Sequence, residues 1–376
     1  MIYEQALTAV VDELVAPGAV EVDRSGSFPR RQIDALGAAG LLGLTVPEEL
    51  GGGGQGMRAA ATVVRELGAA CGSTAMIMMM HYSATAALIA GNRQEALREI
   101  ATGRHLTTLA FSEFGSRSHF WAPVSTATAA GDDVLLDAQK SWVTAAGEAD
   151  SYVWSSRPLQ VAGPMTLWLV PSDAEGLRVP SPFDGLGLRG NASSPVTADG
   201  VRVKSAAMLG ADGAGLDLAL SAVLPLFLVL NASASVGLMK AVAAETAEHL
   251  QKTQLQHLSQ SLAQQAGPRA HLAQLRIEAD RGRAFVDDTI TAVEEGRQDA
   301  MVQVLGVKAA AGESAAFAAD LALRACGGSA FRKESPIERR FRDSRAARVM
   351  APTTEALHDF VGRVLCGLPL FDEAPA

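Results

Sequence analysis

The sequence of 376 residues is poor in cysteine, in aromatic residues and in clustered positive charge. Its three cysteines, Cys71, Cys326 and Cys366, are far apart. They form no metal-ligand or redox pair, and we expect no metal site and a reducing, cytoplasmic location. The net charge is −9, because 41 acidic residues outnumber 32 Lys and Arg. Nucleic-acid binding requires a basic surface, so this class of function is excluded.

Membrane insertion is the next possibility to weigh. The N-terminus lacks the basic segment followed by an apolar core that a signal peptide requires. One uncharged segment, 218–239, is long enough to span a bilayer. It contains Pro225 and Asn231, and it lacks basic flanks that would fix its orientation. We therefore expect a buried helix of a soluble protein and no membrane span.

The apolar pattern divides the chain into three parts. Residues 1–105 repeat apolar side chains at helical spacing, with helices expected at 59–70 and 73–89. Over 106–212, short β-type runs separated by Gly, Pro, Asp and Ser are typical of an antiparallel sheet domain. Helical spacing returns over 213–376. The expected fold class is α+β and mostly α: helices, then sheet, then helices.

One apparent motif is a GxGxxG pattern at Gly185, Gly187 and Gly190. A dinucleotide-binding fingerprint of this kind follows a strand and opens a helix. Here the pattern follows Ser-Pro-Phe-Asp and continues into Asn-Ala-Ser-Ser-Pro, which does not readily begin a helix. We predict that it is not a nucleotide site.

Four segments resemble known sequence signatures. Segment 109–119 is similar to Tyr-x-x-Thr-Glu-x-Gly-x-Gly-Ser-Asp, and 136–144 resembles Leu-x-Gly-x-Lys-x-Trp-Ile-Thr. Segments 326–331 and 340–345 resemble Gly-Gly-x-Gly and Tyr-Arg-Asp-x-Arg. In this order, and along nearly the whole chain, the segments resemble the acyl-CoA dehydrogenase family. The resemblance implies an N-terminal helical domain, a middle antiparallel β domain and a C-terminal four-helix bundle. It also implies a flavin-dependent oxidoreductase that passes a hydride to flavin N5.

The resemblance implies FAD as the cofactor, with FMN as an alternative, and it assigns residues to the flavin ring. Ser112 would hydrogen-bond the pyrimidine edge, with the backbone at Leu109 and Phe111 beside it. Trp142 would lie against one face of the ring, and Thr144 would contact the N5 side. The plainer alternative is that Trp142 is a core aromatic and Thr144 a cross-strand partner.

Other positions match residues near the cofactor's phosphates. Ser118 corresponds to a pyrophosphate-binding serine, and Thr353 and Glu355 correspond to positions near the phosphate region. Gly327 and Gly328 would let the backbone approach the cofactor of a neighbouring subunit. This shared arrangement implies a homodimer or homotetramer.

Departures from the family pattern concern the phosphate contact and the base. Segment 255–260 lacks the family's Arg-x-x-Phe-Gly, so one charge-assisted phosphate contact is missing. Ala351 replaces the Glu that takes the α-proton, and Phe227 occupies the alternative base position. The backbone N–H of Ala351 could still polarise a thioester carbonyl. The candidate proton acceptors are His81, which could equally be a core histidine, and His119, which could cap a turn.

Three functions therefore stay open. The leading one is oxidation of an acyl thioester, carried by CoA or a carrier protein, with an electron-transfer partner. The first alternative is a flavin-dependent monooxygenase supplied by a flavin reductase, favoured by the missing carboxylates and altered phosphate contacts. The second is a non-catalytic thioester-binding homologue.

Overall fold

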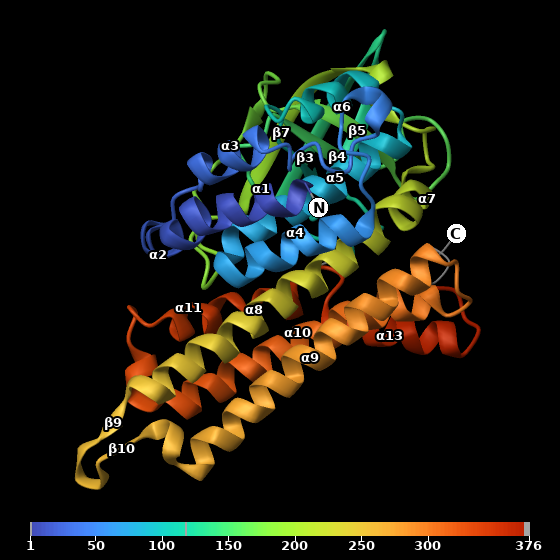
Figure 1. Ribbon diagram of the computed structural model, residues 1–376. Helices are drawn as coiled ribbons and strands as arrows, with labels where there is room; N and C mark the ends of the chain where they lie inside the picture. The colour runs from blue at the N-terminus through green and yellow to red at the C-terminus, as the bar shows by residue number, and fades with distance from the viewer. Residues whose placement is uncertain (1, 117–118, 372–376) are drawn as a thin grey trace.

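The computed structural model describes residues 2–116 and 119–371. Helices and sheets from the first half of the chain form one end of the molecule, and the long C-terminal helices pack along them (Figure 1). The helices before the sheets are α1 (Ile2–Val10), α2 (Ala16–Ser25), α3 (Arg30–Ala38), α4 (Met57–Ala70), α5 (Gly72–Ala90) and α6 (Gln94–Ala101). The expected helices at 59–70 and 73–89 are confirmed by α4 and α5.

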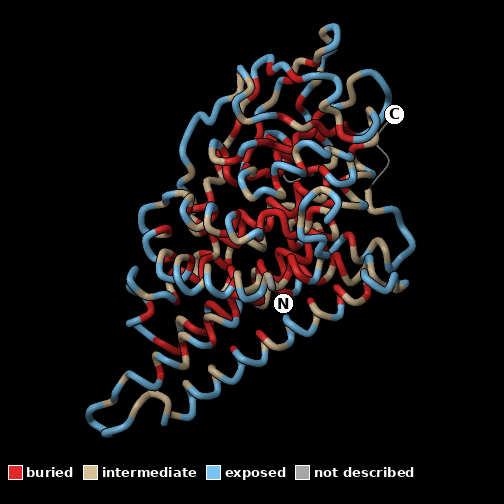
Figure 2. Tube along the Cα trace, turned by 45° about the horizontal axis from the view of Figure 1, so that its top comes forward, coloured by how far each residue is buried: buried red, intermediate tan, exposed pale blue. Residues whose placement is uncertain are grey.

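Helix α5 lies at the centre of the molecule, packed against α4, α8 and strand β1. Because partners surround it, it is apolar on all sides rather than on one stripe. Met78, Met79 and Tyr82 are fully buried along it. The most deeply buried part of the chain occupies this central region (Figure 2).

Two four-stranded sheets follow, with strand orders β1-β4-β5-β8 and β2-β3-β7-β6. All their pairings are antiparallel except β1 with β4, which run parallel. The chain leaves β1, builds β2 and β3 of the other sheet, and returns to β4, and such a long connection permits a parallel pair. The bounds are β1 (Thr107–Ala110), β2 (Thr126–Ala130), β3 (Asp133–Val143), β4 (Ser151–Ser156), β5 (Thr166–Pro171), β6 (Leu177–Arg178), β7 (Ser194–Lys204) and β8 (Met208–Leu209).

The C-terminal part is helical, and α8, α9 and α10 run alongside one another (Figure 1). A two-stranded hairpin, β9 (Gln254–Leu255) and β10 (Gln260–Ser261), joins α8 to α9 and projects from the end of the bundle. The helices are α7 (Gly215–Leu218), α8 (Leu224–Lys252), α9 (Ala266–Glu294), α10 (Ala300–Cys326), α11 (Pro336–Asp343), α12 (Ala346–Val349) and α13 (Thr354–Leu365), with a π-helical turn at Ala219–Val223.

Two helical stretches are long and apolar enough to cross a membrane, Gly72–Ala90 and Gly215–Lys252. Within their most apolar windows, 78% and 83% of the residues are buried inside the protein. Their apolar surface is therefore already covered by protein. This agrees with the expectation that 218–239 is a core helix.

A cavity between the sheets and the C-terminal helices

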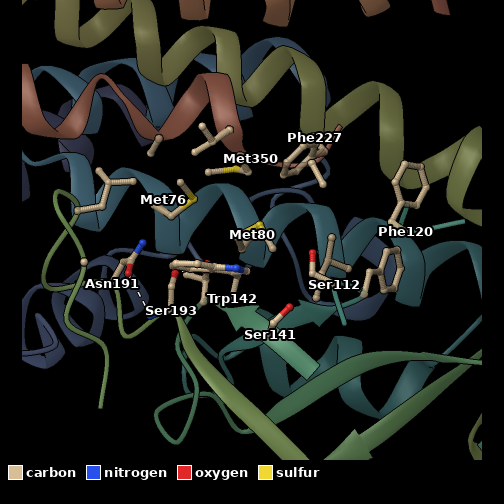
Figure 3. Close-up of a pocket in the computed structure, with 18 of the residues that line it drawn as sticks. Met76, Met80, Ser112, Phe120, Ser141, Trp142, Asn191, Ser193, Phe227 and Met350 are labelled. Atoms are coloured by element: carbon tan, nitrogen blue, oxygen red, sulfur yellow. Dashed lines mark hydrogen bonds between the residues drawn. The ribbon is translucent and has the colours of Figure 1, made fainter. Parts of the chain in front are cut away.

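A cavity of about 740 Å³ lies where the ends of β1 and β3 meet α5, the start of α8 and the segment 342–352. One wall is built by the sheets and their loops, and the opposite wall by the C-terminal helices. In Figure 3, Ser112, Ser141 and Trp142 lie on the sheet side, and Met350 and Phe227 lie across from them. Met76 and Met80 of α5 also line the cavity.

The sheet wall brings together all five residues that the sequence assigns to a flavin ring. Leu109, Phe111, Ser112, Trp142 and Thr144 line the same cavity. The Ser141 N–H donates to the Ser112 carbonyl at 2.9 Å, which joins the loop after β1 to the end of β3. The Thr144 hydroxyl lies 3.1 Å from that of Ser193. Two segments about thirty residues apart thus form one surface.

Trp142 is not a core residue, because 69% of it is exposed. The backbone explains its orientation. The register of β3 with β7 shifts between Lys140 and Val143, and Trp142 has φ +56°, which is unusual for a residue other than glycine. A bulge with such a backbone redirects a side chain that regular strand geometry would bury, and strained residues of this kind cluster at functional sites.

A buried ion pair supports the sheet wall from behind. Glu113 lines the cavity, and its carboxylate accepts from the Lys140 ammonium and from the N–H of Val124 at 2.6 Å. The same ammonium donates to the Ser155 carbonyl at 2.6 Å. Burial would raise the pKa of Glu113, but Lys140 and the hydrogen bonds hold it below its ordinary value. Sequence inspection missed this pair, although both residues lie in the segments that carry the resemblance.

The helical wall carries no counterpart to this carboxylate. Phe227, Val349, Met350, Ala351 and Pro352 line it. Among the described residues that line the cavity, Glu113 is the one acidic side chain, and it is paired. Ala351 and Phe227 line the same cavity. The resemblance matches these two positions to those of the family's base, and neither side chain can accept a proton. In the described part of the chain, the Ala351 N–H has no hydrogen-bond acceptor.

The two histidines proposed as proton acceptors are placed elsewhere. His81 is fully buried in α5, with Nε2 3.0 Å from the Leu42 carbonyl and Nδ1 accepting from the Thr107 N–H at 3.1 Å. Burial lowers its pKa to about 4. Both nitrogens are thus used in the core, which excludes His81 from contact with a ligand in the cavity. The His119 Nδ1 lies 2.8 Å from the Ser116 carbonyl, as in a turn cap, and His119 does not line the cavity.

Four of the residues expected near cofactor phosphates, Gly327, Gly328, Thr353 and Glu355, do not line this cavity. Gly327 and Gly328 begin a short 3₁₀ helix after α10 and have open space beside them. Thr353 caps α13 by accepting from the Ala356 N–H at 3.3 Å, and Glu355 is exposed in its first turn. Ser118 lies outside the described residues. The role of these positions in a neighbouring subunit's site stays a prediction.

The GxGxxG segment forms a loop that leads into β7, with no helix after it. The glycines serve packing instead. A Cβ at Gly187 would lie 2.6 Å from the backbone of Arg342, and one at Gly190 would lie 2.8 Å from the Ser27 carbonyl. Asp343, beside this loop, is buried and accepts from the Leu188 N–H at 2.6 Å. Its pKa is raised by burial.

The cavity suits a flat aromatic ring system. An exposed indole faces it, the hydroxyls of Ser112 and Thr144 lie on the same wall, and the opposite wall is apolar. The cations on its lining are Arg342 and Arg345. Arg342 is already bound to Asp23 at 2.6 Å. The described residues of one chain therefore fit the flavin ring of the cofactor better than they fit the cofactor's phosphates.

Comparison with known proteins agrees with this architecture. Residues 2–104, 108–201 and 213–366 match the N-terminal, middle and C-terminal domains of acyl-CoA dehydrogenase. The chain is 29% identical to human mitochondrial short-chain specific acyl-CoA dehydrogenase over 90% of this chain and 83% of that protein. It is 28% identical to a probable acyl-CoA dehydrogenase of Bacillus subtilis, over 93% of each. Butyryl-CoA dehydrogenase from Megasphaera elsdenii superposes with a TM-score of 0.89 at 21% identity, covering 97% and 98% of the two chains.

The chain belongs to the acyl-CoA dehydrogenase family, which confirms the resemblance and the fold class expected from the sequence. The family consists of flavin-dependent oxidoreductases that act on the CH–CH bond of acyl thioesters. Ala351, which lines this cavity, is the residue that the sequence resemblance matches to the family's Glu.

Proposed function

We propose that the cavity binds an acyl thioester between the sheet wall, which holds the ring of FAD, and the helical wall, which holds the thioester carbonyl. The observation that carries this proposal is that Trp142, Ser112 and Ala351 line one cavity. Met350, the residue before Ala351, lies across from Trp142 and Ser112 (Figure 3). A bound flavin supplies a two-electron acceptor for oxidation of the acyl group.

The residues of the chain divide the remaining work. The Trp142 indole covers one face of the ring and excludes water, and the Ser112 and Thr144 hydroxyls donate hydrogen bonds to its polar edge. The Ala351 N–H donates to the thioester carbonyl and thereby stabilises negative charge that develops there. Phe227 excludes water from the reacting carbon.

The missing step is removal of the α-proton. The one carboxylate on the described lining, Glu113, is held by Lys140 and does not act as a free base. We infer that saturated, unactivated acyl thioesters bind but are oxidised slowly. The carrier of the acyl group, CoA or a carrier protein, decides the partner at the mouth of the cavity, and an electron-transfer protein would reoxidise the flavin.

The absence of an unpaired carboxylate on the described lining also favours a second function, a flavin-dependent monooxygenase. In that case a flavin reductase supplies reduced flavin and oxygen is the co-substrate. Such chemistry needs no base at residue 351. The same cavity and the same ring contacts would serve it.

Assembly is part of the proposal. Phe331 is 87% exposed, and it ends the short 3₁₀ helix that begins with Gly327 and Gly328. We propose a homodimer or homotetramer in which these residues complete the phosphate contacts of a neighbouring site. Light scattering of the purified protein should give at least twice the 39.1 kDa chain mass. A monomer that retains flavin tightly would contradict the shared site.

One experiment tests the function. Flavin-loaded protein is titrated anaerobically with straight-chain acyl-CoAs, and calorimetry follows binding while absorbance follows bleaching of the flavin. We expect binding with slow bleaching. An oxygenated product formed only with reduced flavin and oxygen would establish the monooxygenase instead. Protein that takes up no flavin, or that binds no thioester, would refute the dehydrogenase assignment.

A further inference from the structure

A second lysine is buried behind the helical wall. Lys308 lies on α10 and is 1% exposed. Its ammonium donates three hydrogen bonds, to the carbonyls of Ala347 at 2.9 Å, Met350 at 2.9 Å and Pro352 at 2.8 Å. All its donors are thus used by the segment that carries Ala351. No carboxylate among the described residues forms a salt bridge with it.

The contact with Met350 has a particular chemical consequence. The Met350 carbonyl and the Ala351 N–H belong to the same peptide group. The Lys308 ammonium, hydrogen-bonded to the carbonyl oxygen, draws electron density toward that oxygen through the peptide group. The N–H of the same group therefore becomes a stronger donor. Ala351, at the other end of this peptide group, lines the cavity, and its N–H has no acceptor within the described residues.

We propose that Lys308 is a positioning residue that polarises the Met350–Ala351 peptide, and so strengthens the N–H that receives the thioester carbonyl. This inference rests on the proposed function for the identity of the ligand. In this proposal the positive charge that acts on the thioester carbonyl lies behind the helical wall and not on a side chain in the cavity. The backbone N–H of residue 351 transmits it, so an alanine at this position is sufficient.

The charge on Lys308 responds to pH near neutrality. Burial lowers the pKa of Lys308 to about 7, and Glu355 in the first turn of α13 opposes this effect. Among the described residues Glu355 is the charged group that acts on it. The ammonium is therefore present below pH 7 and lost above it, and polarisation of the Ala351 amide should fall as the pH rises.

The sequence permits a direct measurement. Met350 and Ala351 form the one Met-Ala pair among the 11 methionines of the chain. Protein grown with carbonyl-¹³C methionine and ¹⁵N alanine therefore gives a single amide signal with a ¹³C neighbour. We expect this signal to titrate with a midpoint near pH 7 in the full-length, flavin-loaded protein. Lys308→Arg should fix it at its low-pH position, and Lys308→Met should abolish the titration.

Two control variants identify the titrating group. Lys240→Met removes an exposed lysine that pairs with Glu66, and His358→Gln removes an exposed histidine of α13. Neither should change the titration. A signal that stays fixed between pH 5.5 and 8.5, or that moves alike in Lys308→Met, would overturn the proposal. If Lys308→Met fails to fold, wild type and Lys308→Arg still decide between the outcomes.

Ligand binding separates this inference from the proposed function. Adding butyryl-CoA should move the Ala351 signal, and the affinity should weaken roughly tenfold from pH 6 to pH 8.5 in wild type but not in Lys308→Arg. If the Ala351 signal titrates but no acyl-CoA perturbs it, the thioester function is refuted, while the polarisation of the Met350–Ala351 peptide by Lys308 is retained. A perturbed signal without titration would retain the thioester function and refute the role of Lys308.

Discussion

The two walls of the cavity are each supported by a buried lysine, but the lysines differ in what neutralises them. Lys140 behind the sheet wall is paired with Glu113 and also donates to Ser155. Lys308 behind the helical wall donates only to backbone carbonyls. The sheet wall is therefore neutral and rigid. Behind the helical wall, Lys308 has no salt bridge to a carboxylate among the described residues, and its charge lies next to the place where negative charge would develop.

This difference teaches how the cavity can lose its base and keep a thioester site. In the proposed function the ring contacts depend on the sheet wall, which the ion pair of Lys140 and Glu113 supports, although burial lowers the pKa of Lys140 to about 8. In the same proposal, activation of the thioester carbonyl depends on the helical wall, through the Ala351 N–H and the Lys308 ammonium behind it. Neither group is a side chain of the cavity, so both remain when residue 351 is alanine, and only removal of the α-proton is left without a residue.

The largest expected effect comes from restoring an acid to the helical wall. Ala351→Glu should accelerate flavin bleaching by a straight-chain acyl-CoA by about 10² to 10⁴, the usual contribution of general base catalysis. Stopped-flow absorbance under anaerobic conditions measures it. Ala351→Gln has the same shape without a base and serves as the control.

Phe227→Glu places the carboxylate at the family's other base position in the same cavity. Bleaching by either acidic variant would show a dehydrogenase cavity that lacks only its base. Fast bleaching by the wild-type protein would contradict the inference drawn from Ala351. Folded acidic variants that bind acyl-CoA yet both fail to bleach would favour the monooxygenase.

Breaking the ion pair should destabilise the sheet wall more than any change on the helical wall. Glu113→Ala leaves Lys140 buried without its partner, which costs about 3 to 5 kcal/mol of unfolding free energy. Urea unfolding measures the loss. Asp280→Ala removes the partner of Arg276 in an exposed pair and should change stability by less than about 0.5 kcal/mol. A similar small loss in Glu113→Ala would show that the pair does not fix the wall.

How much of the fold and of the two cavity walls the sequence predicts depends on whether a contact is local or long-range. Local spacing predicted helices α4 and α5 and the β character of the middle of the chain, because apolar periodicity is a property of short segments. The matching segments indicated Ser112 and Trp142, which the structure places on one cavity. The parallel pairing of β1 with β4 did not, since no short segment encodes a connection through another sheet.

The support behind each wall was missed for a physical reason. Lys308 joins α10 to carbonyls about forty residues further along the chain, and backbone acceptors leave no mark in a sequence. His81 illustrates the converse. The sequence offered it as a candidate proton acceptor, yet different faces of α5 point to different neighbours, so Met80 lines the cavity and His81 contacts Leu42.

A smaller effect is expected for the aromatic face of the sheet wall. Trp142→Ala removes a ring contact worth about 1 kcal/mol beyond area burial, so flavin should bind roughly fivefold more weakly. Fluorescence titration of the flavin-free protein measures this. Val20→Ala trims an apolar side chain that is exposed on α2 and should leave the affinity unchanged. Unaltered flavin affinity in Trp142→Ala would place the ring elsewhere.

The smallest effect concerns His81, whose ring should not affect the pH dependence of the cavity at all. Its folded pKa is lowered from 6.5 to about 4 by burial, so the unfolded chain binds a proton that the folded chain refuses as the pH falls below 6.5. Stability should therefore decrease between pH 6.5 and 4, while nothing changes above 6.5. The ring signals in NMR should stay those of neutral imidazole from pH 5.5 to 8. His81→Gln should lose stability but keep the pH profile of acyl-CoA binding, because the ring faces Leu42 and not the ligand. If the His81 ring titrates near neutrality and acyl-CoA affinity changes with the same midpoint, His81 acts on the ligand after all. The pH dependence of binding would then come from His81 rather than from Lys308.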